Sequence, residues 1–417
     1  MEFSKHDTTI LRQLASEKAE IAALPINDNN KKLWYDTNDL KATKPPIFIN
    51  ELPWHEMNIN DELTLRCKNS FARELELLLR KELYCYRHVR GNMVVTDSID
   101  CPVVIKDSGF GIDEDVDIRQ TDANSNIVSR TFNVQISGIE DIEKIKDPVI
   151  TLDKKQSKDR LDLYREVFDG LLRVQQVGVK GYWFTPWDNL VRWTGVQEAL
   201  MDLIINPEYI EKLVERFVDA SISRLEQYEN LGLWASNNNN TRVGSGGYGY
   251  TTALADADEH LINTALTEVW GCGNAQIFSD VSSQMHWDFS LKHELRWLER
   301  FGLNYYGCCE PLHLKMDILD KVPNLRKVSA SPWAKLEKMR DHAKGKYVLS
   351  CKPNPAIFAD ANWSIERAEA DILNILEKSG GCNIEIIMKD VSTVSYKPER
   401  LWQWSKIAQN TVDKFYK

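Results

Sequence analysis

The sequence has no long apolar run, no excess of positive charge and no paired-cysteine motif, and each absence excludes a class of protein. No segment approaches 18 consecutive apolar residues, so no transmembrane helix is predicted. Acidic residues outnumber basic ones by 62 to 52, and the net charge of −10 argues against a nucleic-acid-binding surface. Residues 1–10 lack the apolar stretch of a signal peptide. We therefore expect a cytoplasmic protein that binds neither nucleic acid nor membrane.

The eight cysteines are scattered along the chain without a C-x-x-C pair. In a large cytoplasmic chain, such cysteines are expected to be buried thiols or metal ligands rather than disulfides.

What is present is a core-forming composition, 43% hydrophobic, and a strand–helix rhythm. From about residue 146, short apolar runs alternate with helical patterns, which predicts parallel strands joined by right-handed crossovers. About eight such runs fit a (β/α)8 barrel. The rival is an open doubly wound sheet, but no G-x-G-x-x-G follows the first strand. We predict an α/β protein: a (β/α)8 TIM barrel over residues 146–417, with an N-terminal α+β extension, residues 1–145, packing on it.

In such a barrel, the working residues lie at the carboxyl ends of the strands and in the loops that follow. This rule selects a set of acid–base candidates for catalysis: Asp280, Lys352, Lys389 and Asp390. It selects a second set for substrate binding: Trp187, Asn237, Ser282 and Asn354. A buried ion pair that closes the barrel is an equal interpretation of Lys389 and Asp390. The glycine-rich segment 244–249 is interpreted as a mobile loop above the pocket, and segment 51–56 as a solvated loop that could reach over the mouth.

The segment YYGCCEPLH, residues 305–313, holds the strongest cluster: Cys308, Cys309, Glu310 and His313. Zinc binds thiolate, imidazole and carboxylate ligands, and a catalytic site keeps one position open. Cys351 or Cys382 could add a distant thiol. Zinc lowers the pKa of a bound thiol, which suits methyl transfer to sulfur. The alternative is that these cysteines only pack in the core.

Several segments together resemble the uroporphyrinogen decarboxylase superfamily, in particular its decarboxylase-like branch. They are residues 52–58, 185–217, 305–313, 349–359 and 389–408. The resemblance implies a (β/α)8 barrel and one of two chemistries. One is cofactor-free decarboxylation of uroporphyrinogen, and the other is zinc-dependent methyl transfer between a corrinoid protein and a thiol.

The sequence lacks the arginine-rich R-Q-A-G-R loop of the true decarboxylases, which argues against a tetrapyrrole substrate. The methyltransferases of the family carry His-x-Cys where this chain has Tyr306-Gly307-Cys308, and Cys-Gly-Ile where it has Cys382-Asn383-Ile384. The resemblance thus implies zinc held by Cys308 and Cys382, with Cys309, Glu310 or His313 completing the set.

The leading hypothesis is a methyltransferase that moves a methyl group between a small substrate or a corrinoid and a thiol or corrinoid acceptor at a zinc-thiolate site. The corrinoid would be carried by a partner protein. The first alternative is a metal-free decarboxylase or other lyase acting on a small carboxylic acid. There Lys352 or Lys389 would stabilise negative charge, and Asp280 or Asp390 would position a proton. The second is a non-catalytic barrel that binds a small ligand. A homodimer is also expected, because barrels often pair.

Overall fold

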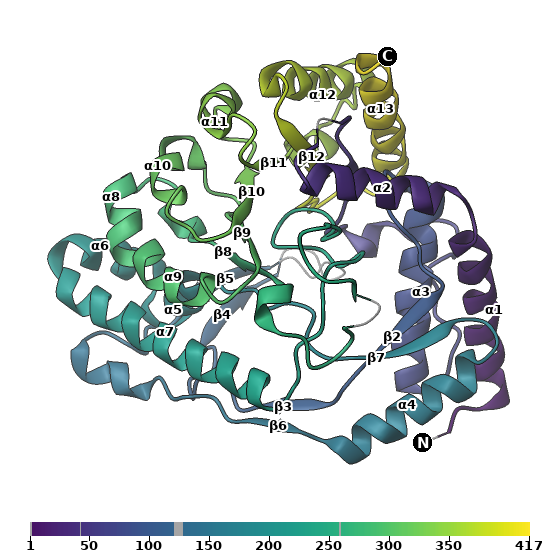
Figure 1. Cartoon of the computed structure of the whole chain (residues 1–417), viewed down its shortest axis with the longest axis horizontal. Coiled ribbons are helices and arrows are strands. Elements are labelled where there is room, and N and C mark those ends of the chain that lie inside the picture. Colours follow the sequence, from purple (N-terminus) through teal and green to yellow (C-terminus); the bar gives the residue numbers. More distant parts are fainter. Residues whose placement is uncertain (1, 42, 121–127, 258–259) are drawn as a thin grey trace.

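The computed structural model describes residues 2–41, 43–120, 128–257 and 260–417, and it shows an α/β fold built on a six-stranded parallel sheet (Figure 1). The strands lie in the order β1 (Ile47–Ile49), β12 (Asn383–Met388), β11 (Val348–Cys351), β10 (Leu325–Ala330), β9 (Leu303–Tyr306) and β8 (Trp270–Gly273). Every neighbouring pair is parallel, and the sheet curls into half a barrel. The predicted α/β class with parallel strands is confirmed.

Helices connect these strands as the strand–helix rhythm predicts. They are α8 (Ser283–His286), α9 (Lys292–Leu298), α10 (Met316–Leu319), α11 (Leu336–Ala343) and α12 (Ile365–Ser379), and α13 (Glu399–Phe415) follows the last strand. Local signals set their ends. The Ser364 side chain accepts a hydrogen bond from the backbone N–H of Arg367 where α12 begins, and Gly380 ends that helix with a φ of +36°.

The remaining strands form separate pairs. β2 (Ser98–Pro102) and β7 (Arg173–Val177) are parallel, and one isolated parallel bridge links Val179 to Trp234. β3 (Ile105–Asp107) with β6 (Ile150–Leu152), and β4 (Val116–Arg119) with β5 (Ser129–Phe132), are antiparallel. Over the described part of the chain, β1 and β2 do not pair, so a closed ring of eight strands is not shown.

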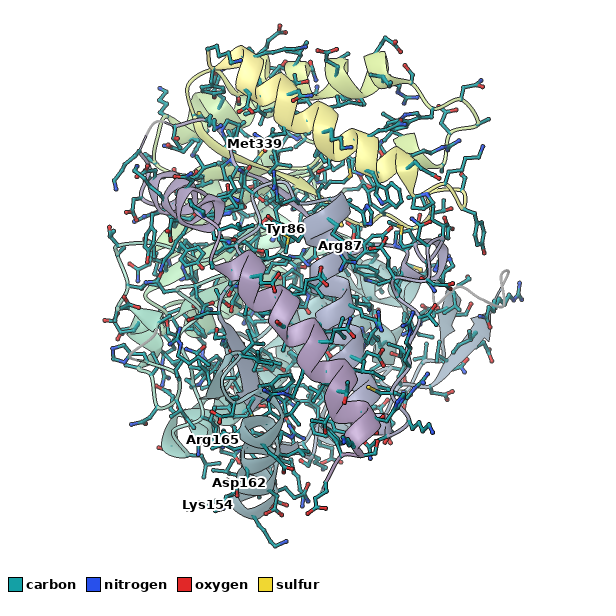
Figure 2. The ribbon with its side chains drawn as sticks, turned by 90° about the vertical axis from the view of Figure 1, so that its right-hand side faces the viewer. Tyr86, Arg87, Lys154, Asp162, Arg165 and Met339 are labelled. Carbon is teal, nitrogen blue, oxygen red and sulfur yellow. The ribbon has the colours of Figure 1, made fainter. Side chains whose placement is uncertain are left out.

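The amino-terminal third contributes to the main sheet as well as packing beside it. Its helices are α1 (Lys5–Ala22), α2 (Ile26–Asn38) and α3 (Ser70–His88), and α1 packs on both α3 and α4 (Lys154–Phe168). Figure 2 shows α1 across this face, with Tyr86 and Arg87 of α3 beside it and Asp162 and Arg165 of α4 below. β1 is the edge strand beside β12. The boundary at residue 145 stays a prediction. The chain continues through α5 (Pro186–Thr194), α6 (Val196–Ile205) and α7 (Pro207–Asn230).

Residues 241–250 pack against β10 and β12 of the main sheet, and the interpretation of the glycines as a mobile loop is wrong. Residues 245–250 are all buried. The backbone N–H of Gly247 donates to Glu385 Oε1 at 3.1 Å, and Lys327 Nζ donates to the carbonyl of Tyr248 at 3.1 Å. Lys327 and Glu385 are themselves a fully buried ion pair, 2.9 Å apart. Glycine is needed here because a Cβ on Gly246 would lie 2.3 Å from Glu385 Oε1.

Candidate functional site

Cys308 and Cys309 follow β9 directly and lie at the wall of a cavity of about 380 Å³. Gly307 turns the chain with a φ of +100°, and the Cys308 N–H then donates to Glu310 Oε2 at 2.9 Å. Ser329 Oγ donates to the Cys308 carbonyl at 2.6 Å. These bonds fix the two cysteines at the carboxyl ends of the sheet's strands. The residues lining the cavity are Glu51, Trp183, Arg242, Gly244, Ser245, Gln276, Cys308, Cys309, Lys389 and Asp390.

The two sulfur atoms lie 3.6 Å apart, and Lys389 Nζ lies 3.8 Å from Cys308 Sγ. The S–H of Cys309, followed by the ammonium groups of Lys389 and Lys352, lowers the pKa of Cys308 to about 7 against the opposing effect of burial. The same contact with Cys308, together with burial, raises the pKa of Cys309. Near neutral pH Cys308 therefore changes from thiol to thiolate, while Cys309 keeps its proton.

Two carboxyl groups and two cations face these sulfurs. Lys389 Nζ lies 2.6 Å from Asp390 Oδ2 and 3.2 Å from Glu51 Oε2, and Arg242 pairs with Glu51. Burial opposes the change, but hydrogen bonding to Asp390 and the charges of Arg242 and Lys389 lower the pKa of Glu51 to about 2. Burial and the neighbouring Glu51 raise the pKa of Asp390. Asp390 thus keeps its proton to higher pH than Glu51 does.

Glu51 and Asp390 follow the paired strands β1 and β12 and share an uncommon backbone conformation. Their φ angles are +55° and +56°. A left-handed residue other than glycine costs about 1–3 kcal/mol and is found most often at functional sites. The turn it makes at both strand ends brings the two carboxyl groups to the same cavity.

Lys352, which directly follows β11, is not in the cavity wall but bonds two residues that are. Its ammonium group donates to Ser245 Oγ at 2.7 Å and to the Cys308 carbonyl at 3.0 Å, and it also bonds Ser329. Burial lowers the pKa of Lys352 to about 8. These contacts make Lys352 a positioning residue that holds Ser245 and the Cys308 backbone.

The structure brings together only part of the ligand set that the sequence suggested. The carboxylate of Glu310 is fully buried and accepts hydrogen bonds from the backbone N–H groups of Cys308 and Ala275, and burial raises its pKa. His313 is half-buried and is not among the residues around the cavity. Cys382 precedes β12, so it lies at the amino-terminal ends of the strands, away from the cavity, and its sulfur is 3.8 Å from the Arg340 carbonyl. Cys351 is buried in the core.

These residues do not fit a zinc site. Within the described residues, no three His, Cys, Asp or Glu side chains gather in a metal-binding arrangement. Tyr306, which stands where the resembling methyltransferases have histidine, is fully buried and bonds His286 Nε2 at 2.8 Å. Asp390, the carboxylate nearest Cys309, already pairs with Lys389.

The residues predicted to bind substrate, and Asp280, lie elsewhere. Asp280 is exposed, and none of these residues belongs to the described lining of the cavity. The side chains of Trp187 and Asn237 are buried, donating to the carbonyls of Phe289 and Trp270 at 3.0 Å each. Ser282 and Asn354 accept hydrogen bonds from backbone N–H groups at the starts of two short helices. Their role in binding substrate stays a prediction.

Six lining residues were not among the predicted site residues: Glu51, Trp183, Arg242, Gly244, Ser245 and Gln276. Glu51 belongs to segment 51–56, for which the sequence predicts a solvated loop. Arg242 is a single cation between the asparagine run 237–240 and the glycines, just after the segment that bridges Val179. No strand ends directly before Arg242, so the strand-end rule could not have identified it.

Comparisons with known proteins show the fold. No model of a known family matches the chain, and no curated protein matches it. In the part of the chain that the structure describes, no helix is both long and apolar enough to cross a membrane. Among solved structures, the chain is similar to a methyltransferase from Methanosarcina mazei, with a TM-score of 0.50 and 9% sequence identity, covering 93% of this chain and 99% of that chain. Because a shared fold at this identity does not fix the chemistry, the likeness shows the architecture alone.

Proposed function

We propose that the chain is a methyltransferase that moves a methyl group from a methylated donor to a thiol acceptor in the cavity beside Cys308. The observation that carries this proposal is the placement of Cys308 Sγ at the cavity wall, 3.8 Å from the ammonium group of Lys389 and 3.6 Å from the Cys309 thiol. The likeness in fold to a methyltransferase supports it. The donor is a small methylated compound or a methylated corrinoid presented by a partner protein.

The residues of the cavity suffice for the proton transfers. The acceptor thiol gives its proton to the Cys308 thiolate, and the acceptor sulfur displaces the leaving group from the methyl carbon. With a small methylated donor the leaving group takes the proton held on Cys308, and with a corrinoid donor that proton would pass to solvent. Either route restores the thiolate and balances the reaction. Lys389 supplies the positive charge that favours a thiolate at this place, the role that a metal ion plays in other thiolate sites.

The test is turnover with deuterated methanol, methylamine or methoxybenzoate as donor and 2-mercaptoethanol as acceptor, measured as the methyl thioether by mass spectrometry. We expect Cys308→Ala to lower the rate by at least about 100-fold, a typical loss for a group that moves a proton. Cys382→Ser is the matched control, since Cys382 lies at the amino-terminal ends of the strands, away from the cavity. Full turnover in Cys308→Ala, or an equal loss in Cys382→Ser, would overturn the proposal.

Decarboxylation of a small acid is the second candidate, favoured by two cations and a carboxyl of raised pKa at one cavity. Arg242 would bind the substrate carboxylate, carbon dioxide would leave, and Asp390 would give its proton to the carbanion. In this reaction Asp390→Asn should abolish release of carbon dioxide, whereas Cys308→Ala should retain it. The two variants therefore distinguish the two chemistries.

A further inference from the structure

Cys308 and Cys309 form a vicinal dithiol that opens to the cavity. The sulfurs lie 3.6 Å apart, and both residues line the cavity wall. Cys309 is partly exposed, so a ligand can reach the pair from solvent. Among the residues that the structure describes, none of the other six cysteines lines this cavity.

The separation of the sulfurs suits one shared soft centre. Two thiolates bound at about 2.3 Å to one tetrahedral ion stand about 3.8 Å apart. A disulfide needs the sulfurs at about 2.05 Å, a much closer approach. The present distance of 3.6 Å therefore matches chelation with little movement.

The surroundings decide which centre the pair binds. Zinc needs at least three protein ligands, and the described residues supply no such group. Asp390 Oδ2, 3.7 Å from Cys309 Sγ, already pairs with Lys389. An atom bound here can take only two ligands from the protein, the two sulfurs, so its third bond must be to a group that it carries into the site. We propose that Cys308 and Cys309 bind a trivalent arsenical that carries one organic group.

The binding step involves no oxidation or reduction. An arsine oxide, R–As=O, forms one As–S bond to each cysteine, and the two thiol protons leave with the oxygen as one water. The arsenic keeps its bond to carbon and ends three-coordinate, and soft thiolate sulfur is the ligand it prefers. The organic group has room in the cavity of about 380 Å³, where the Trp183 ring forms part of the wall. This proposal does not depend on methyl transfer.

Phenylarsine oxide is the probe, added to the reduced full-length chain. We expect one phenylarsenic group per chain by intact mass, and two fewer thiols in a titration with a disulfide reagent. The adduct should map to the tryptic peptide 301–315, which contains both cysteines and no other. It should resist monothiols and be removed by 2,3-dimercaptopropanol.

Single variants show whether both sulfurs take part. Because the second As–S bond forms within one complex, Cys308→Ser or Cys309→Ser should each weaken binding by at least about 100-fold. Cys382→Ser should bind as the unaltered chain does. An adduct on another peptide, or undiminished binding in either single variant, would overturn the proposal. Protection of the two thiols by an equal concentration of zinc would also overturn it, because such tight binding would show that the chain supplies the further protein ligands that zinc needs.

Discussion

Lys389 is the cation that lies between the acidic groups of the cavity. Its ammonium group lies within reach of the Cys308 sulfur and of the carboxylates of Asp390 and Glu51. Burial alone would lower the pKa of Lys389, but the neighbouring Cys308, Asp390 and Glu51 raise it above its ordinary value. The ammonium group is therefore present throughout the pH range in which Cys308 titrates. The pH dependence of the cavity chemistry therefore comes from the Cys308 thiol, and the fixed charge of Lys389 lowers the pH at which that thiol ionises.

Alkylation of Cys308 by iodoacetamide measures this dependence. The reactive form is the thiolate, so the rate should rise with pH and reach half its maximum near pH 7, the pKa of about 7 that the contacts of Cys308 give it. Lys389→Met removes a favourable charge and should raise that midpoint by about one unit, about 1.4 kcal/mol. At pH 7 the rate would then fall several-fold. Modification is followed on the peptide 301–315.

Lys378→Met is the matched control, because Lys378 is a surface residue that pairs with Glu337. It should leave the midpoint unchanged. An unchanged midpoint in Lys389→Met would show that Lys389 does not stabilise the thiolate, and the proposed proton transfers would lose their cation.

At this scale the sequence identified the residues that directly follow strands. The strand-end rule selected Cys308, Lys389 and Asp390, which the structure brings to one cavity. Cys382, which the resemblance and not this rule suggested as a zinc ligand, precedes its strand and so lies at the amino-terminal ends of the strands, away from the cavity. The rule missed Arg242 because the position of that side chain depends on how segment 241–250 folds back against the sheet.

The segment 241–250 acts as a structural element although it contains neither helix nor strand. Its backbone is bound by the Lys327–Glu385 pair, and its glycines pack against Tyr305 and Trp34. This contact carries Arg242 and Ser245 to the cavity. Strands and helices follow from local apolar periodicity. A packed glycine segment has no such period, so the sequence suggested mobility where tertiary contacts impose order.

Gly246→Ala tests this packing. The added Cβ would meet Glu385 Oε1 at 2.3 Å and Tyr305 Cε2 at 2.7 Å, so the buried layer must shift. Overpacking of this kind costs roughly 1–3 kcal/mol, and the urea midpoint should fall accordingly. Gly181→Ala is the control, because its Cβ would have only one neighbour within 4 Å, at 3.9 Å. Equal stability of the two variants would contradict the packed role of the segment.

The whole molecule depends on contacts between its first third and its last strand. β1 supplies the edge of the sheet beside β12, and its residues Ile47 and Ile49 are buried. Trp34 is fully buried against the glycine segment and donates to the carbonyl of Asn92. Burial of each such side chain contributes about 1.5–3 kcal/mol, and the total stability of a protein is about 5–15 kcal/mol. The loss of these three side chains alone approaches that total.

A chain of residues 146–417 should therefore fail to fold, although the alternation of strands and helices suggested a barrel over that range. Removing residues 1–145 exposes β12 as an unpaired edge, which favours aggregation, and takes Glu51 from the cavity. We expect no cooperative thermal transition by circular dichroism and elution as aggregate on gel filtration. Removal of only residues 416–417 should leave both measurements as in the full chain. A cooperative transition in the 146–417 chain would instead establish residue 145 as a domain boundary. It would also show that the sheet folds without β1.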